Sequence, residues 1–271
     1  DHMLEGRFNF GISPGGLMSD AEVFGNLDRD RNAMFVECIN MVLSIWEGDP
    51  PYDLEGEFFN VSTKRTMMPD IGQGVIMKPY QQPHPLIVGT VVAPYSKGVT
   101  AMAARGWEPI SANFLLPKWV ATHWPNYAQG CEQGGRPADY NNWRVAKNIC
   151  VAKDQETARR YARDPGSPYV LYYNSLLTKL ARGGRLNLFK EDQDMPDDEV
   201  TLDYVLDRLV IHGDAESVTD QLLEFRETTG PFGHLVYAGH DWTDVELGRQ
   251  SMILMAEKVL PKLQEATRAA A

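Results

Sequence analysis

The sequence has few features that would hold a structural zinc ion, a disulfide framework or a nucleic acid. Its 271 residues contain three cysteines, Cys38, Cys131 and Cys150, and their spacing fits neither a zinc site nor a redox pair. The formal net charge is −11, which disfavours binding to a phosphate backbone or to an anionic membrane surface. No apolar run reaches the roughly 18 to 20 residues of a membrane span. We therefore expect a soluble cytoplasmic protein with reduced thiols, without a metal or nucleic-acid partner.

Patterns typical of strands and helices alternate along the chain. Strands are expected at residues 8–12, 85–92, 109–114, 143–152 and 234–238, and helices at 31–46, 97–105, 118–129, 154–162, 214–229 and from 244 onward. Asp154 and Asp214 are placed to cap two of these helices, and Gly230 ends one. Residues 52–77 are expected to be irregular. A segment at about 165–212, with helical patches and an acidic linker at 191–199, resembles an insertion.

Five strands that are each followed by a helix indicate a parallel α/β architecture. A complete (β/α)₈ barrel needs eight such units and about 250 residues. An open doubly wound sheet is an alternative, but the Gly-rich fingerprint of dinucleotide-binding sheets follows none of the predicted strands.

Several short motifs, taken in order, resemble the bacterial luciferase-like flavin-dependent monooxygenase family. They are GRFNFG at residues 6–11, LSIW at 43–46, LEGEFF at 54–59, the apolar strand at 85–92 with the turn APYSKG at 93–98, GDAESVTDQL at 213–222 and the strand at 234–239. Each motif alone is weak, and the resemblance rests on their shared order over nearly the whole chain.

The resemblance implies a luciferase-like (β/α)₈ TIM barrel and places GRFNFG at its fourth strand. Residues 1–271 would then form one partial barrel domain, and the first three strand–helix units would precede Asp1. The general acid/base histidine of the luciferases would lie in the same preceding portion. No catalytic residue is therefore assigned in this sequence.

The turn at residues 93–98 is the clearest candidate for a phosphate site. It lies where a buried strand ends and a helix begins, and free N–H groups at a helix N-terminus bind phosphate. A plain helix cap formed by Ser96 is the alternative. The resemblance favours the flavin phosphate, and implies cofactor contacts from Ser13, Thr90, Val92, Ala93, Tyr95, Ser96, Lys97 and Gly98.

The chain departs from the luciferase catalytic subunits at Pro14, where they commonly place an arginine that binds the flavin phosphate. The segment around Pro14, Ser-Pro-Gly-Gly at residues 13–16, is either a ligand contact or a simple turn.

Three residues are candidates for binding the substrate. Asn113 closes a predicted strand, where a surface asparagine is an equally good interpretation. His240 follows the last predicted strand, where a lone loop histidine is usually just solvated. Tyr173, with Tyr169, Tyr172 and Leu176, would line the apolar mouth of a pocket, where barrel enzymes build their selectivity.

The implied chemistry is activation of O₂ by reduced FMN and oxygenation of an apolar organic substrate such as a terpene, alkane or aldehyde. A separate flavin reductase would supply the reduced FMN, and the enzyme would be a homo-oligomer such as a dimer. Two alternatives remain open. One is a deazaflavin (F420)-dependent oxidoreductase, and the other is a non-catalytic partner subunit like the supporting subunit of luciferase.

Overall fold

Apolar runs flanked by proline and glycine form parallel strands, as the sequence predicts. The computed structural model describes residues 1–240 and 242–269 and divides into two units, Asp1–Thr90 and Val91–Ala271. None of the helices in these described ranges has the length and apolar content to cross a membrane. All three cysteines are free thiols.

The first unit places one long helix beside short strands. β1 runs parallel to β4, with Asn9 opposite Leu86 and Ile12 opposite Gly89. Asp30 caps the long helix α2 through hydrogen bonds from two backbone N–H groups. The elements in order are η1 (His2–Leu4), β1 (Asn9–Ile12), α1 (Met18–Val23), α2 (Arg31–Glu47), β2 (Asp53–Glu55), β3 (Asn60–Ser62), η2 (Pro69–Ile71) and β4 (Leu86–Val91).

A β-hairpin corrects the expectation that residues 52–77 are irregular. β2 and β3 pair antiparallel, and the carboxylate of Glu37 on α2 accepts hydrogen bonds from the backbone N–H groups of Glu57, Phe58 and Phe59, at 2.8 to 2.9 Å. Burial opposes ionisation of the Glu37 carboxyl, but the three hydrogen bonds together outweigh it and lower the pKa of this group. Three-residue strands are too short to show a period of two, and a contact twenty residues away in sequence holds their turn, so local pattern could not reveal the hairpin.

The second unit is built around β6, in which all residues after Arg144 are buried. β5 and β8 pair in parallel with the first half of β6, and β7 pairs in parallel with its second half. Its elements after β4 are α3 (Lys97–Ala104), β5 (Glu108–Ser111), α4 (Pro117–Ala121), α5 (His123–Gln133), η3 (Tyr140–Asn142), β6 (Arg144–Val151), α6 (Gln155–Arg163), α7 (Pro168–Arg182), η4 (Leu186–Leu188), η5 (Asp197–Glu199), α8 (Leu202–Leu209), β7 (Val210–Gly213), α9 (Ala215–Thr229), β8 (His234–Tyr237), α10 (Val245–Leu254), the π-helical turn η6 (Met255–Val259) and α11 (Leu260–Ala269).

The helix caps agree with those predicted from the sequence, whereas strand β7 was not predicted. The side chains of Asp154 and Asp214 accept backbone N–H groups at the starts of α6 and α9, and Gly230 ends α9. β7 follows α8 without an intervening residue, so no glycine or proline separates helix from strand. The expected helix at 118–129 is two helices, α4 and α5.

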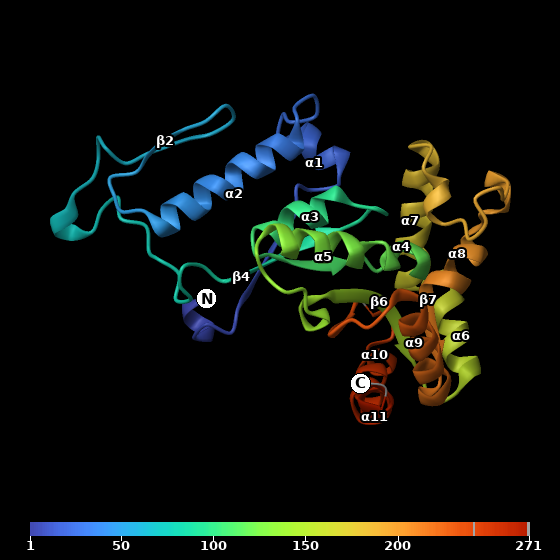
Figure 1. The fold of residues 1–271 in the computed structure, drawn as a ribbon. Helices are drawn as coiled ribbons and strands as arrows, with labels where there is room; N and C mark the ends of the chain where they lie inside the picture. Colours follow the sequence, from blue (N-terminus) through green and yellow to red (C-terminus); the bar gives the residue numbers. More distant parts are fainter. Residues whose placement is uncertain (241, 270–271) are drawn as a thin grey trace. The chain divides into compact units, whose positions relative to one another are not determined.

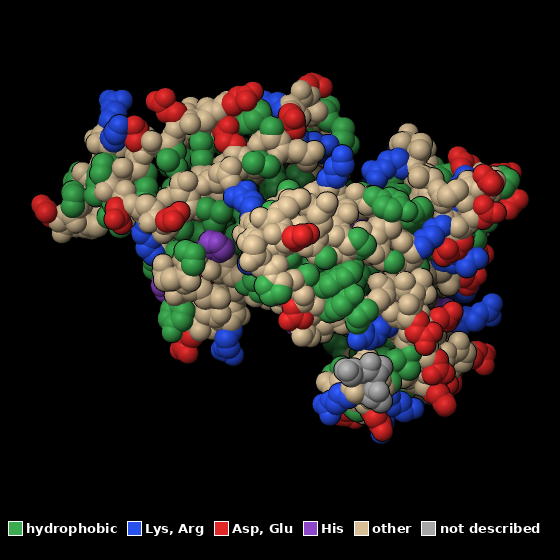
Figure 2. Space-filling view, in the orientation of Figure 1, with side chains coloured by type: hydrophobic (Ala, Val, Ile, Leu, Met, Phe, Trp, Pro, Cys, Tyr) green, Lys and Arg blue, Asp and Glu red, His purple; other side chains and the backbone are tan. Residues whose placement is uncertain are grey.

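The acidic linker predicted at 191–199 lies on the surface of the second unit. Figure 2 shows Asp and Glu side chains gathered where Figure 1 draws the chain entering α8. The ammonium group of Lys190 pairs with the carboxylate of Asp197 at 2.6 Å. The exposed acidic residues of the linker are Glu191, Asp192, Asp194, Asp197, Asp198 and Glu199.

Helices α3 and α5 lie side by side in the second unit (Figure 1), and their backbones meet at Gly130. A Cβ atom added to Gly130 would lie 2.3 Å from the carbonyl oxygen of Thr100 and 2.6 Å from the Cβ of Ala103. Real Cβ atoms do not approach this closely, so the packing depends on the missing side chain.

The expected α/β fold with a mainly parallel sheet is confirmed. Closure into an eight-stranded barrel, and the grouping of all 271 residues into one barrel domain, stay predictions.

Replacing Gly130 with alanine should force α3 and α5 apart. We expect the free energy of unfolding to fall by about 1 to 3 kcal/mol, the usual cost of overpacking a core, measured by urea denaturation. Gly16→Ala is the matched control, because a Cβ atom there meets nothing within 4 Å. Equal stability of the two variants would contradict this account of the helix contact.

Candidate functional site

Side chains of α5 and of Thr122, the residue between α4 and α5, hold the turn at residues 93–98 by its backbone. This segment, the candidate phosphate site, is called the phosphate turn below. The Nε2 atom of His123 is 3.0 Å from the carbonyl oxygen of Ala93. The N–H of Tyr95 donates to Oγ1 of Thr122 at 2.9 Å, and Nδ2 of Asn126 donates to the carbonyl of Ser96 at 3.0 Å. The turn is thus held at three backbone groups, those of Ala93, Tyr95 and Ser96.

The hydrogen bonds of His123 determine its tautomer. The indole N–H of Trp143 donates to the hydroxyl oxygen of Ser111 at 2.9 Å, and that hydroxyl lies 2.8 Å from Nδ1 of His123. The carbonyl of Ala93 can only accept, so the imidazole carries its proton on Nε2 and accepts the Ser111 hydroxyl proton at Nδ1. Burial lowers the pKa of the His123 imidazole to about 4, although the bond to Ala93 opposes this shift. A neutral imidazole therefore positions the turn.

The start of α3 has the properties of an anion site. Ser96 occupies the N-cap position, but its side chain makes no capping hydrogen bond. Within the described part of the chain, the backbone N–H groups of Lys97 and Gly98 have no acceptor. Both residues are exposed, as are Val92 and Tyr95. These donors lie at the positive end of the helix dipole, and Lys97 adds a cation.

The other two predicted cofactor residues belong to the first unit. Thr90 is an exposed residue of β4. The hydroxyl oxygen of Ser13 accepts the N–H of Gly15 at 3.4 Å, and Ser13 lines a mainly apolar cavity of about 290 Å³. Arg31 lines the same cavity beside Pro14. A guanidinium group is therefore present near Pro14 although position 14 itself has none.

The three predicted substrate residues meet at one buried side chain, that of Asn148 on β6. The Oδ1 atom of Asn148 accepts from Nδ2 of Asn113 at 3.0 Å and lies 3.0 Å from Nε2 of His240. The Nδ2 atom of Asn148 donates to the hydroxyl of Tyr173 at 2.7 Å. These hydrogen bonds join Asn113, Asn148, Tyr173 and His240 into one network, which we call the Asn148 network.

One carbonyl group sets the direction of every bond in the Asn148 network. The Tyr173 hydroxyl donates to the carbonyl of Leu209 at 3.3 Å, so its oxygen must accept from Asn148. The Oδ1 atom of Asn148 then faces His240, whose Nε2 must carry a proton. The Oδ1 atom of Asn113 is left to accept the Tyr172 hydroxyl at 3.1 Å.

Aromatic rings enclose this polar group. The His240 ring lies 4.6 Å from that of Tyr172 and 5.6 Å, edge on, from that of Tyr169, between ring centres. Tyr173 is fully buried, whereas Asn113 and His240 are half-buried. Burial raises the pKa values of the Tyr172 and Tyr173 hydroxyls, which stay protonated donors. The arrangement thus places hydrogen-bonding groups among aromatic rings.

Sequence reasoning missed Asn148, His123, Ser111 and Arg31. Asn148 did leave a signal, because it is a polar residue that lies, next to Lys147, inside the otherwise apolar strand run from Val145 to Val151. A buried amide must find partners, so its position marks a place where other polar side chains converge.

Acid should reveal the buried, neutral state of His123. The ordinary imidazole pKa is 6.5 and that of folded His123 is about 4, so between these values only the unfolded chain binds the proton. The free energy of unfolding should therefore fall by about 3 kcal/mol from this residue as the pH drops from 6.5 to 4. Urea denaturation at several pH values should show a smaller acid loss for His123→Gln. Parallel pH profiles for the two proteins would refute the assignment.

Comparison with known proteins agrees with the resemblance seen in the sequence. The chain is 26% identical over 270 residues to 4-hydroxyprotoasukamycin monooxygenase of Streptomyces nodosus subsp. asukaensis, covering 97% of this chain and 67% of the relative. It is 23% identical over 269 residues to limonene 1,2-monooxygenase of Rhodococcus erythropolis, covering 96% and 62%. The chain thus spans about two thirds of the length of these relatives.

Solved structures show the same fold. The oxygenating constituent of 3,6-diketocamphane monooxygenase from Pseudomonas putida, in complex with FMN, matches with a TM-score of 0.81 at 21% identity, covering 97% of this chain and 72% of that one. An F420-dependent secondary alcohol dehydrogenase matches with a TM-score of 0.60 at 18% identity, covering 96% and 71%. Because the luciferase-like monooxygenase family model matches residues 1–231, the chain belongs to the luciferase-like monooxygenase family.

Proposed function

We propose that the protein uses reduced FMN and O₂ to oxygenate a small, apolar organic molecule of the terpene, alkane or aldehyde type. Membership of the luciferase-like monooxygenase family supports the reaction class. Relatives named for limonene and diketocamphane support an apolar substrate, and the FMN complex of a structural relative supports the cofactor. The observation that carries the proposal is the Asn148 network, a set of buried and half-buried hydrogen-bonding groups beside the rings of Tyr169 and Tyr172.

The residues at the phosphate turn fit the flavin phosphate. Backbone N–H groups of Lys97 and Gly98, the hydroxyl of Ser96 and the ammonium of Lys97 are donors suited to a dianion. Held in place by His123, Thr122 and Asn126, they need little rearrangement to bind it. Val92, Ala93 and Tyr95 complete the proposed cofactor contacts of the second unit, and the contacts expected from Ser13 and Thr90 of the first unit stay predictions. When bound, the reduced flavin supplies the activation of O₂.

The Asn148 network would orient the polar end of the substrate. Asn113 uses one amide hydrogen on Asn148 and has a second one, so it is suited to donate to a substrate carbonyl or hydroxyl oxygen. His240 lies beside it, and the half-buried ring of Tyr172 would contact the apolar part and exclude water. Binding would then depend mainly on shape and apolar area, with one polar group fixing the orientation.

We further propose a separate flavin reductase as partner, a homo-oligomeric state such as a dimer, and a cytoplasmic location. The same fold occurs in F420-dependent enzymes, which keeps a deazaflavin-dependent hydride transfer as the second candidate. A supporting subunit without activity is the third.

Product formation tests the proposed function. The full-length protein, supplied with reduced FMN and O₂, should convert at least one candidate terpene, alkane or aldehyde into an oxygenated product in excess of the hydrogen peroxide released. If peroxide is the sole product, the monooxygenase assignment is wrong. Titration separates the alternatives, because preferential binding of F420 would indicate hydride transfer, and a supporting subunit would bind neither FMN nor F420.

Replacing Asn113 with leucine should weaken substrate binding. We expect KM for the substrate to rise about tenfold, since one hydrogen bond contributes about 1.4 kcal/mol, while the Kd for FMN stays within about twofold. Steady-state kinetics and flavin fluorescence measure the two effects. Asn174→Leu, at an exposed position of α7, is the matched control. An unchanged KM in Asn113→Leu would remove Asn113 from the substrate site.

A further inference from the structure

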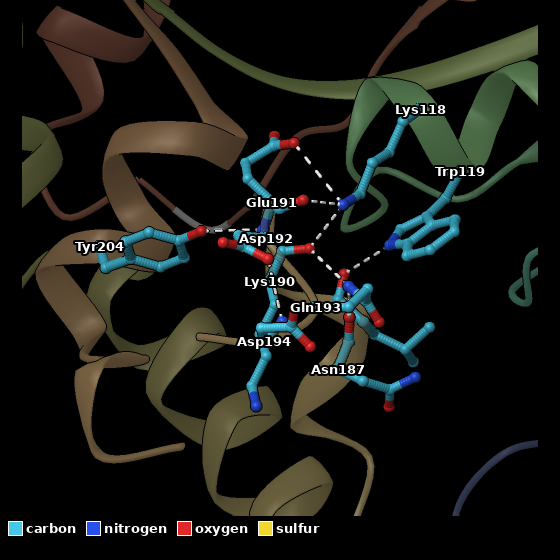
Figure 3. Close-up of polar contacts among 10 residues, drawn as sticks. Lys118, Trp119, Asn187, Lys190, Glu191, Asp192, Gln193, Asp194 and Tyr204 are labelled. Carbon is cyan, nitrogen blue, oxygen red and sulfur yellow. Dashed lines mark hydrogen bonds and ion pairs between the residues drawn. The ribbon is translucent and has the colours of Figure 1, made fainter. Parts of the chain in front are cut away.

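The short helix α4 contacts both the phosphate turn and the loop at residues 186–193, which we call the cap loop. Two neighbouring side chains of α4, Lys118 and Trp119, make the contacts to the cap loop (Figure 3). The loop belongs to the insertion-like segment that also provides Tyr172 and Tyr173 on α7. Contacts on both sides of α4 therefore link two parts of the proposed site.

On the cap-loop side, α4 satisfies backbone carbonyl groups. The indole N–H of Trp119 donates to the carbonyl of Leu188 at 3.0 Å. The ammonium of Lys118 donates to the carbonyls of Lys190, at 2.8 Å, and of Glu191, whose carboxylate is 3.8 Å away. Figure 3 shows these bonds converging on the loop. An ammonium group thus satisfies backbone carbonyls of residues 190 and 191, which follow the short helix η4 and belong to no helix or strand.

The cap loop also makes hydrogen bonds within itself and with α8. The amide of Gln193 donates to the carbonyls of Asn187 and Lys190, and the Tyr204 hydroxyl accepts the N–H of Glu191 at 3.0 Å. The loop is a hydrogen-bonded unit whose position is set by α4 and α8.

On the turn side, Trp119 contacts a residue with an unusual backbone. Tyr95 has φ of +51°, in the left-handed region that favours glycine. Its ring packs edge on against the Trp119 ring, with centres 6.3 Å apart. Its N–H donates to Oγ1 of Thr122, which in turn donates to the Trp119 carbonyl at 2.6 Å. These contacts offset the cost of the strained backbone.

The cap loop continues into the wall of the Asn148 network. Phe189 is fully buried and shares one hydrophobic cluster with Tyr173 and Trp119. Tyr173 in turn accepts the amide N–H of Asn148. A continuous set of packed and hydrogen-bonded groups therefore runs from Tyr95 to the network.

We propose that Trp119 is a positioning residue that couples the phosphate turn to the cap loop, so that a flavin phosphate at the turn orders the wall of the substrate site. The inference rests on the proposed function, since it needs FMN at the turn. Lys118 acts with Trp119 by fixing the far end of the same loop. Neither residue is required to touch the flavin or the substrate.

Hydrogen exchange tests the coupling in the full-length protein, with oxidised FMN and phosphate-free riboflavin as probes. FMN should slow exchange of the backbone amides at 186–193 by about fivefold or more relative to riboflavin, the lower end of usual coupling energies. Trp119→Phe keeps a ring against Tyr95 but lacks the N–H donor. It should bind FMN within about threefold of the wild-type Kd and lose the slowing.

Lys118 provides a second variant should Trp119→Phe fail to fold. Lys118→Met should lose the slowing at 190–191, Lys118→Arg should retain it, and Lys179→Met, at an exposed position of α7, should behave as wild type. The coupling is wrong if FMN and riboflavin act alike on the wild-type loop, or if both Trp119→Phe and Lys118→Met keep the slowing. Absence of FMN binding to the wild-type protein would overturn the proposed function itself and this inference with it.

Discussion

A buried amide in the middle of strand β6 is the constraint around which the candidate site is arranged. Asn148 cannot remain unpaired inside the protein without a large cost in free energy. The Leu209 carbonyl then decides which atom of each partner donates, through Tyr173, Asn148, His240 and Asn113. One acceptor that cannot change its role therefore orients a network drawn from several elements of the second unit.

A second chain of hydrogen bonds gives the phosphate turn its geometry in the same way. The indole N–H of Trp143 can only donate, and the Ala93 carbonyl can only accept. The donor and acceptor in the hydrogen bond between Ser111 and His123, which lie between these two groups, are therefore fixed. Both chains end on backbone carbonyls, and both contain an imidazole with its proton on Nε2. Side-chain hydrogen bonding in this protein thus serves mainly to hold other groups in place.

Most elements of regular structure could be predicted from the sequence, because long apolar periods and caps such as Asp154 and Asp214 are local signals. The hairpin β2–β3 and strand β7 could not, since Glu37 holds the first from a distant helix and the second begins where α8 ends. Asn113, Tyr173 and His240 were each predicted separately, from strand ends and aromatic content. That they share Asn148 is a long-range fact, which only the packing of β6 against its neighbours reveals. The roles of these residues, and of the turn residues from Ala93 to Gly98, remain predictions.

The missing side chain at Gly130 has a thermodynamic consequence for the turn. Because the backbones of α3 and α5 touch there, the two helices form a rigid block, and the turn at the start of α3 is hydrogen-bonded to that block. Most of the conformational entropy of ordering the turn backbone is then lost when the chain folds, so any ordering that a bound anion causes falls on groups outside these helices, such as the cap loop. The affinity for a ligand is then reduced less by the entropic cost of ordering than it would be at a flexible loop.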